Sequence, residues 1–411
     1  MAIALIYIFN SILLIGFSYW HFLSYDQSPI RSHFWPAWLF KICSGLFLGG
    51  LFYGYYQSGD TIHFYEQASR LAQLDPVAFF EAITQGTVPS QSVRAIYFVR
   101  IVAVVKWLTH ADYWLLSVYF SFASFCGATL LVDQLVRWRA DLKIPAIVAF
   151  LYFPSIVFWS SGLLKESLAF AAVSVLIGCF LAWQQTKKFS FGSFLLSVLA
   201  LAIIVWIKYY VAAVLIPLLI YLVLYHIPFG KKWIEFSLWQ RTGILTLALV
   251  LPVLGFLQWL SPNLSMSRLW LVMQENHEAY IQLAPHGAVY TLSWFDNGWD
   301  LFVNMPYLWF SGLFRPVLGE DFSFPAVLAS LENLALLIGA VLALLMVAKK
   351  KKMPWTAERL ATVIYVTVLA IFLSYSAPNL GTLARFKIYY APFVVLWIVY
   401  QLQSFKLFRK D

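Results

Sequence analysis

The most regular feature of the chain is a series of continuous apolar runs separated by short polar segments. Each run approaches the length of about 20 residues that an α-helix needs to cross a bilayer. Alternating polarity over about ten residues, the mark of a transmembrane β-strand, is not seen. The pattern therefore predicts an all-α polytopic bundle of about eleven transmembrane helices. The predicted spans are residues 3–23, 38–56, 113–136, 144–158, 167–183, 193–207, 211–225, 243–260, 325–347, 360–373 and 388–400.

Composition supports a membrane protein and excludes most soluble classes. Of the 411 residues, 62% are apolar and 11% are charged, whereas soluble domains have about 25% charged residues. Cys43, Cys126 and Cys179 lie far apart inside apolar runs, so they indicate neither a disulfide framework nor a metal site. We therefore expect a single integral membrane domain over residues 1–411.

Basic residues gather in short segments that the predicted spans place on one side of the membrane. Excess Lys and Arg mark cytoplasmic loops, so we expect an external N-terminus and a cytoplasmic C-terminus, in a bacterial inner membrane. The net charge of +9 then reflects this basic collar rather than nucleic-acid binding. The clusters are Arg137, Arg139 and Lys143; Lys187 and Lys188; Lys231 and Lys232; Lys349 to Lys352; and Lys406, Arg409 and Lys410.

Two long segments, residues 57–112 and 261–323, fall on the opposite, extracytoplasmic side. Loops of this length are uncommon without a function, so we expect the chemistry there. The first segment reads GDTIHFYEQASRLAQLDPVAFFEAITQG. Its pattern predicts two short amphipathic helices lying on the membrane surface. We expect amphipathic helices in the second segment as well.

Asp60 is the candidate catalytic residue of the first segment. It follows Gly59, and as an N-cap it would accept hydrogen bonds from free amides of a helix opening at Thr61. A carboxylate at the boundary of bilayer and water is also well placed to accept a proton from a sugar hydroxyl. The two roles are compatible. His63, one turn further on, is a candidate binding residue, with a purely structural role as its alternative.

Several charges are predicted at or near the outer boundary of the bilayer. Lys165 and Glu166 follow a helix broken at Pro154 and Gly162, and charges at this depth pair or serve function. Lys165 at a helix start opposes the macrodipole, so it requires an anion, either a carboxylate or a phosphate. Lys208 lies between two short apolar runs, where it either binds an anion or snorkels to the headgroups.

The second long segment and the last outer loop add three cations. Arg315, in an apolar and aromatic surround, favours a bidentate oxyanion, for which Glu320 is the internal candidate and a lipid phosphate the external one. Arg385 and Lys387 precede the final span, against the positive-inside tendency. We interpret them as an anion site, with lipid-headgroup anchoring as the alternative.

Several motifs of other enzyme classes do not occur in the sequence. It contains no GxxxxGK[ST] phosphate loop, no HExxH and no nucleophile elbow. These absences argue against ATP-driven transport and zinc proteolysis. We expect no cofactor, and a divalent cation is not indicated.

Four patches together resemble a known group of bacterial membrane proteins. They are GDTIHFYEQA, PSIVFWSSGLLKES, LFRPVLGE and NLGTLARFKIYYAPF. The first is similar to a GxD…Y stretch of EpsG-like (Wzy-type) polysaccharide polymerases and to the first-loop acidic motif of multi-span GT-C glycosyltransferases. Many GT-C enzymes have two adjacent acidic residues there, whereas Asp60 is followed by Glu66 six residues later, so the resemblance does not extend to a metal site.

The resemblance implies a membrane glycosyltransferase of surface polysaccharide synthesis. Its donor would be a polyprenyl-phosphate-linked sugar and its acceptor a glycan or lipid-linked glycan, with membrane lipids and no nucleic acid as further partners. Asp60 would act as base, and Lys165, Arg315 and Arg385 would stabilise the leaving phosphate in one cavity open to lipid. Alternatives are a Wzy/EpsG-type polymerase, a transporter or flippase of an anionic lipid-linked solute, and an assembly scaffold.

Overall fold

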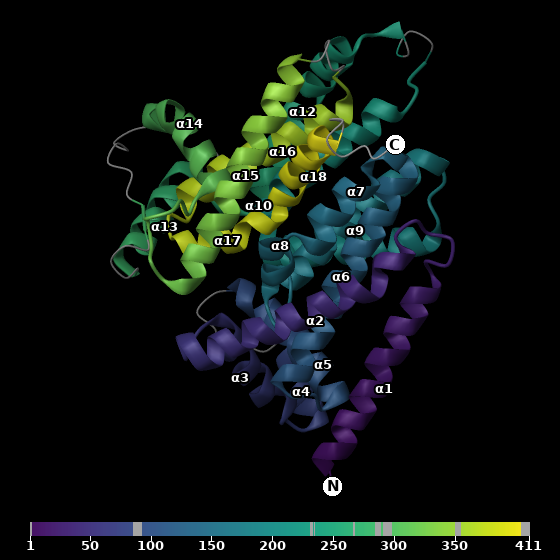
Figure 1. The fold of residues 1–411 in the computed structure, drawn as a ribbon, viewed down its shortest axis with the longest axis vertical. Helices are drawn as coiled ribbons and strands as arrows, with labels where there is room; N and C mark the ends of the chain where they lie inside the picture. The colour runs from purple at the N-terminus through teal and green to yellow at the C-terminus, as the bar shows by residue number, and fades with distance from the viewer. Residues whose placement is uncertain are drawn as a thin grey trace. The chain divides into compact units, whose positions relative to one another are not determined.

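The computed structural model describes residues 2–84, 93–230, 233, 235–265, 268–283, 289–290, 298–349 and 355–403. Among these residues every regular element is a helix (Figure 1). The chain forms two compact units, Met1–Lys208 and Tyr209–Asp411. The boundary falls at Lys208, the polar residue that separates two short apolar runs of the sequence.

Within the described part of the chain, eight helices are long and apolar enough to cross a membrane. A ninth candidate is a pair of helices, Leu380–Tyr389 and Ala391–Gln403, bent by 67°. The predicted helical membrane bundle is therefore confirmed. The eight are Ile3–Leu23, Arg31–Tyr56, Tyr113–Trp138, Lys165–Thr186, Phe191–His226, Leu238–Leu260, Phe324–Ala348 and Ala357–Ser376.

The structure confirms one predicted break and differs from the eleven predicted spans at another place. The predicted spans 193–207 and 211–225 are the two parts of α10 (Phe191–His226), whose helical dihedrals are interrupted at Lys208 (φ −139°, ψ 57°). The span 144–158 is replaced by three short helices, α7 (Lys143–Ile147), η4 (Val148–Tyr152) and α8 (Pro154–Trp159).

Unit 1 is built around the long contact between two parallel-running helices. A Cβ at Gly127 of α6 would lie 2.7 Å from the Ala171 Cα of α9, so only glycine permits this approach. Small residues at a helix interface let apolar helices pack closely. The other regular elements of unit 1 that precede α10 include α1 (Ala2–Leu23), α2 (Phe34–Gly50), η2 (Leu51–Tyr56), α3 (Asp60–Ala72), α4 (Pro76–Thr84) and α5 (Val93–Thr109). The two packed helices are α6 (Tyr113–Trp138) and α9 (Lys165–Thr186).

The segment 57–112 contains the short helices α3 and α4, as predicted, followed by α5. Helix α3 packs along α5 (Figure 1), and Phe64, Phe98 and Val102 are buried in their common core. Asp75 begins α4 as predicted: its Oδ1 accepts hydrogen bonds from the amides of Val77 and Ala78, at 3.1 and 3.2 Å. Hydrophobic packing and a capped start thus hold this segment in a defined shape.

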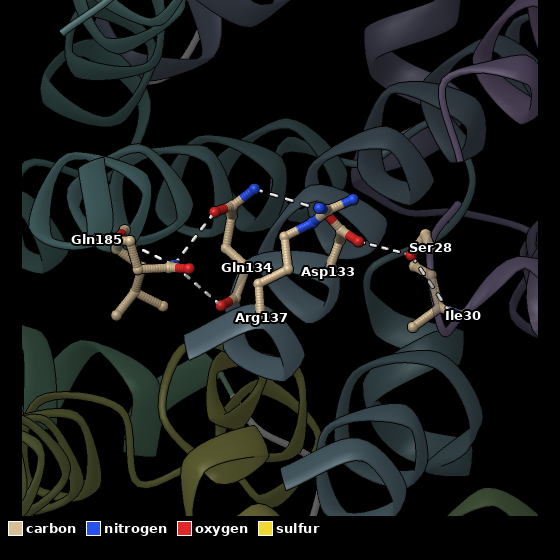
Figure 2. A network of polar contacts seen from close by, with 7 residues as sticks. Ser28, Ile30, Asp133, Gln134, Arg137 and Gln185 are labelled. Atoms are coloured by element: carbon tan, nitrogen blue, oxygen red, sulfur yellow. Dashed lines mark hydrogen bonds and ion pairs between the residues drawn. The ribbon is translucent and has the colours of Figure 1, made fainter. Parts of the chain in front are cut away.

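A polar network fixes one end of α6 to its neighbours (Figure 2). The buried Asp133 carboxylate accepts hydrogen bonds from Ser28 Oγ at 2.5 Å and from Arg137 Nε at 2.7 Å. Gln185 of α9 donates to Gln134 Oε1 at 3.3 Å. Arg137 of the first basic cluster is therefore partly neutralised within its own helix. The basic residues at 231–232, 350–352, 406, 409 and 410 lie outside the described residues.

Unit 2 contains the rest of the long helices and the second long segment. Helix α14 packs along α16, and any Cβ at Gly312 would clash with the Ala370 carbonyl. Helix α15 lies beside α18 (Figure 1). Residues 261–323 contain the helices α13 and α14, and helices were expected in this segment. The elements are α12 (Leu238–Leu260), α13 (Leu269–Leu283), α14 (Gly298–Phe314), α15 (Phe324–Lys349), α16 (Ala357–Ser376), α17 (Leu380–Phe386), η6 (Lys387–Tyr389) and α18 (Ala391–Gln403).

Candidate functional site

Asp60 is the first residue of α3, and the position before it explains how the helix starts. Gly59 occupies the N-cap with φ +136°, and no side chain caps the helix there. The prediction that Asp60 itself is the N-cap is therefore wrong. A Cβ at Gly59 would lie 2.5 Å from the Phe52 ring, and its φ is one that other residues rarely adopt. Glycine thus permits the turn that places a half-buried carboxylate at the helix start.

Lys165 lies over the face of α3 that carries Asp60. Its Nζ is 4.9 Å from the centroid of the Phe64 ring. Asp60 and Phe64 are four residues apart, so they lie on one face of the helix, one turn from each other. His63 is exposed on the same first turn. The structure therefore brings Asp60, His63 and Lys165 to one end of α3.

A buried turn before α9 places Lys165 there. Gly162 has φ +73°, and its amide donates a hydrogen bond to Ser121 Oγ at 2.8 Å. Ser167 Oγ donates to the Gly162 carbonyl, also at 2.8 Å. A Cβ on Gly45 of α2 would lie 3.0 Å from the Gly162 amide nitrogen. The predicted helix break at Gly162 is thus confirmed, and packing against α2 and α6 fixes the residue that opens α9.

Glu166 and Lys208 form a buried ion pair. Lys208 Nζ lies 2.7 Å from Glu166 Oε1, and the exposed fractions of the two residues are 4% and 0%. Lys208 therefore does not snorkel to the headgroups. As candidate substrate-binding residues, both differ from expectation, because burial and mutual pairing give them a supporting role behind Lys165. Removing one member of such a pair leaves an uncompensated charge.

Lys41 is a buried cation that the sequence analysis did not single out. It lies within α2, and its Nζ donates to Ser160 Oγ at 2.5 Å and lies 5.2 Å from the Phe170 ring centroid. Among the described residues, no carboxylate lies within 4.0 Å of this ammonium. The signal was present in the sequence, because a lysine inside an apolar run of spanning length is by default a functional candidate.

In unit 2, Arg315 lies between two aromatic rings. Its Cζ is 4.6 Å from the centroid of Tyr290 and 4.9 Å from that of Tyr307. Nε lies 2.9 Å from Glu320 Oε1, so the predicted pairing with Glu320 is confirmed. Glu320 Oε2 accepts a hydrogen bond from the Val317 amide at 2.9 Å. Nη1 is buried and makes no hydrogen bond within the described part of the chain.

Tyr290 is held rigidly behind this guanidinium. Its hydroxyl lies 2.8 Å from Ser374 Oγ and also donates to the Ser374 carbonyl. Burial raises the pKa of Tyr290, so the phenol stays neutral at physiological pH. A neutral ring with a fixed hydroxyl is a suitable platform for a cation.

Lys387 and Arg385 have separate surroundings, contrary to the predicted shared anion site. Lys387 is buried, and its ammonium donates to the carbonyls of Leu313 and Arg315 and to Asn333 Oδ1. An ammonium has three protons, so these acceptors account for all of them. Arg385 is half-buried in the last turn of α17, with Cζ 5.6 Å from the Phe386 ring centroid. We therefore assign Lys387 a structural role, in which its ammonium binds the backbone carbonyls of Leu313 and Arg315.

The candidate residues thus form two groups, one in each unit. Asp60, His63 and Lys165 lie together in unit 1, and Arg315 pairs with Glu320 in unit 2. That Asp60, Arg315 and Arg385 share one cavity stays a prediction. Within the described ranges, no three His, Cys, Asp or Glu side chains are grouped so that they could hold a metal ion. No protein-family model, curated protein or solved structure matches the chain.

Proposed function

We propose that the protein is a glycosyltransferase of the bacterial inner membrane that acts on the extracytoplasmic side. Its donor is a sugar linked to polyprenyl phosphate or pyrophosphate, and its acceptor is a glycan or lipid-linked glycan of the cell envelope. The observation that carries this proposal is the position of the Lys165 ammonium over Phe64, one turn from Asp60. A carboxylate and a cation at one helix end supply the two charges that glycosyl transfer from a phosphate requires.

The proposed step moves one proton and one sugar. The acceptor hydroxyl gives its proton to the Asp60 carboxylate while its oxygen bonds to the anomeric carbon. The bond between that carbon and the phosphate oxygen breaks, and its electron pair stays on the phosphate. The configuration at the anomeric carbon is inverted. Asp60 is the proposed catalytic base, and His63, exposed on the same turn, contacts the acceptor.

Negative charge grows on the leaving phosphate, so fixed cations lower the barrier. Lys165 provides one such charge. Arg315 provides another, because its guanidinium is ordered by Tyr290, Tyr307 and Glu320 while Nη1 makes no hydrogen bond within the described residues. Arg385 is the third proposed contact. The external N-terminus and cytoplasmic C-terminus belong to the same proposal.

A polymerase is the nearest alternative, since it would use the same step with a lipid-linked oligosaccharide as donor. A carrier of an anionic lipid-linked solute is the second candidate function. It is favoured by the interruption of α10 at Lys208, beside a buried ion pair, because carriers build their sites at broken helices.

The test is the glycan profile of a deletion strain that expresses single variants. Asp60→Asn is expected to lower product formation by a factor on the order of 10²–10⁴ while its lipid-linked donor accumulates on the outer side. Glu66→Gln, an exposed acid on the same helix, is the matched control and should retain product. A transferase loses one residue of the repeat, whereas a polymerase leaves single unpolymerised units.

Two outcomes would contradict the proposal. Full product with Asp60→Asn, in a protein that reaches the membrane in normal amount, excludes the carboxylate as base. Accumulation of the intermediate on the cytoplasmic side instead favours the carrier.

A further inference from the structure

The end of α14 is held by groups from a segment more than seventy residues further along the chain. The last carbonyls of a helix have no partner inside that helix. Here the Lys387 ammonium donates to the Leu313 carbonyl at 3.0 Å and to the Arg315 carbonyl. The Tyr390 hydroxyl donates to the Gly312 carbonyl at 2.6 Å. A cation at this position also complements the negative end of the helix dipole.

Asn333 of α15 ties the same cation to the residue after Arg315. Its Oδ1 accepts a hydrogen bond from Lys387 Nζ at 3.2 Å, and its Nδ2 donates to the Pro316 carbonyl at 3.0 Å. Both side chains are buried. The backbone on each side of the Arg315–Pro316 bond is therefore bound to one connected pair of side chains.

We propose that Lys387 and Asn333 are positioning residues that hold the Arg315 guanidinium in its oxyanion-binding geometry. The cation–π contacts and the ion pair of Arg315 are each worth about 1 kcal/mol, and a backbone free to move after the helix end would weaken all three together. Fixing the backbone removes that freedom, because the guanidinium then extends from a defined point toward Tyr290 and Tyr307. The oxyanion itself belongs to the proposed function, on which this inference rests, whereas the clamp is a property of the chain.

The clamp can be tested without any glycan assay. The probe is phenylglyoxal, which modifies accessible arginines, applied to the purified full-length protein in detergent and followed at Arg315 by mass spectrometry. Lys387→Met and Asn333→Leu are each expected to raise the modification rate of Arg315 about tenfold, because losing a buried hydrogen-bonded partner opens the local structure. Arg31, with a 43% exposed side chain, is the internal reference and should not change.

Lys41→Met is the matched control, since it removes another buried ammonium, in unit 1. Arg315 should stay protected in this variant. If Lys387→Met does not accumulate as folded protein, Asn333→Leu provides the same readout. Unchanged protection of Arg315 in the folded clamp variants, with only the unfolding temperature lowered, would overturn the inference.

Activity separates this inference from the function on which it rests. If Arg315 binds the donor phosphate, Asn333→Leu and Arg315→Ala should both raise the donor KM in the transfer assay. Normal donor use by Arg315→Ala, together with loss of protection in Lys387→Met, would remove the phosphate role and leave the clamp intact.

Discussion

The Lys165 ammonium lies 4.9 Å from the centroid of the Phe64 ring, and this contact connects α9 to the face of α3 that bears Asp60. Lys165 is the first residue of α9. In the proposed reaction, its ammonium contacts the leaving phosphate while Asp60, on the neighbouring turn of α3, accepts the proton of the acceptor.

Lys165→Met is expected to lower the rate of glycosyl transfer roughly 10²–10³-fold, the size of effect seen when one preorganised charge is removed. Lys165→Arg should retain part of the activity, because it keeps the charge. The measurement is product formation in membranes at saturating acceptor.

Lys187→Met is the matched control for this prediction. Lys187 also lies 4.9 Å from an aromatic centroid, that of Trp183, at the opposite end of α9. The control should leave transfer unchanged. Equal losses in the two variants would mean that the cation at residue 165 has no special role.

The loss of either member of the Glu166–Lys208 ion pair is expected to destabilise the protein more than the loss of both members. Glu166→Gln and Lys208→Met should each lower the free energy of unfolding by about 3–5 kcal/mol, because each leaves one buried charge without its opposite charge. The double variant Glu166→Gln/Lys208→Met should recover most of that loss. Unfolding in detergent, followed by circular dichroism, measures all three, and additive losses in the double variant would contradict the prediction.

The sequence predicted the helical membrane bundle because long apolar runs have few other solutions in lipid. It also located the break at Gly162, where glycine adopts a positive φ. It also placed a break between residues 193–207 and 211–225, where the helical dihedrals are interrupted at Lys208. Burial of Lys208 depends on Glu166, 42 residues away, and hydrophobic periodicity carries no information about such contacts.

The sequence identified residues of the candidate site, but it could not predict most of the contacts between them. The local spacing of Arg315 and Glu320 allowed their pairing to be predicted, and the structure contains it. Tyr290 and Ser374 approach across 84 residues, and Lys387 reaches Leu313 across 74. Such contacts arise from helix packing, so local sequence patterns do not distinguish a supporting role for Lys387 from an anion site.

Arg315→Lys is expected to impair donor use although the charge is kept. Lysine has no planar fork and stacks less well between two rings. We expect the donor KM to rise about tenfold, consistent with the loss of one charge-assisted hydrogen bond and the stacking. Steady-state kinetics with varied donor concentration measures this change.

Arg31→Lys is the matched control for the change at Arg315. Arg31 likewise lies over an aromatic ring, Phe22 at 4.8 Å, and pairs with Asp26 at 2.5 Å. It lies in unit 1, in a predicted cytoplasmic connection, so donor use should not change. A normal donor KM in Arg315→Lys would show that charge alone suffices at this position.

His277 of α13 is expected to make unit 2 less stable at acidic pH. Its ring stacks on Tyr375, and Nδ1 lies 2.8 Å from the Tyr375 carbonyl oxygen. Burial lowers the pKa of His277 below the ordinary value of 6.5. The unfolded chain therefore binds a proton at a higher pH than the folded chain does. The stability contributed by the neutral ring is complete above the unfolded pKa and is lost as the pH falls below it.

The measurement is the unfolding midpoint in detergent between about pH 7.5 and pH 5.5, which brackets the unfolded pKa of histidine. The wild-type midpoint should fall over this interval. His277→Asn keeps a donor for the Tyr375 carbonyl but cannot be protonated, so its midpoint should be lower at pH 7.5 and change less with pH. His33→Asn is the control for removing a partly buried histidine from unit 1. An equal slope in wild type and His277→Asn would assign the acid sensitivity to other groups.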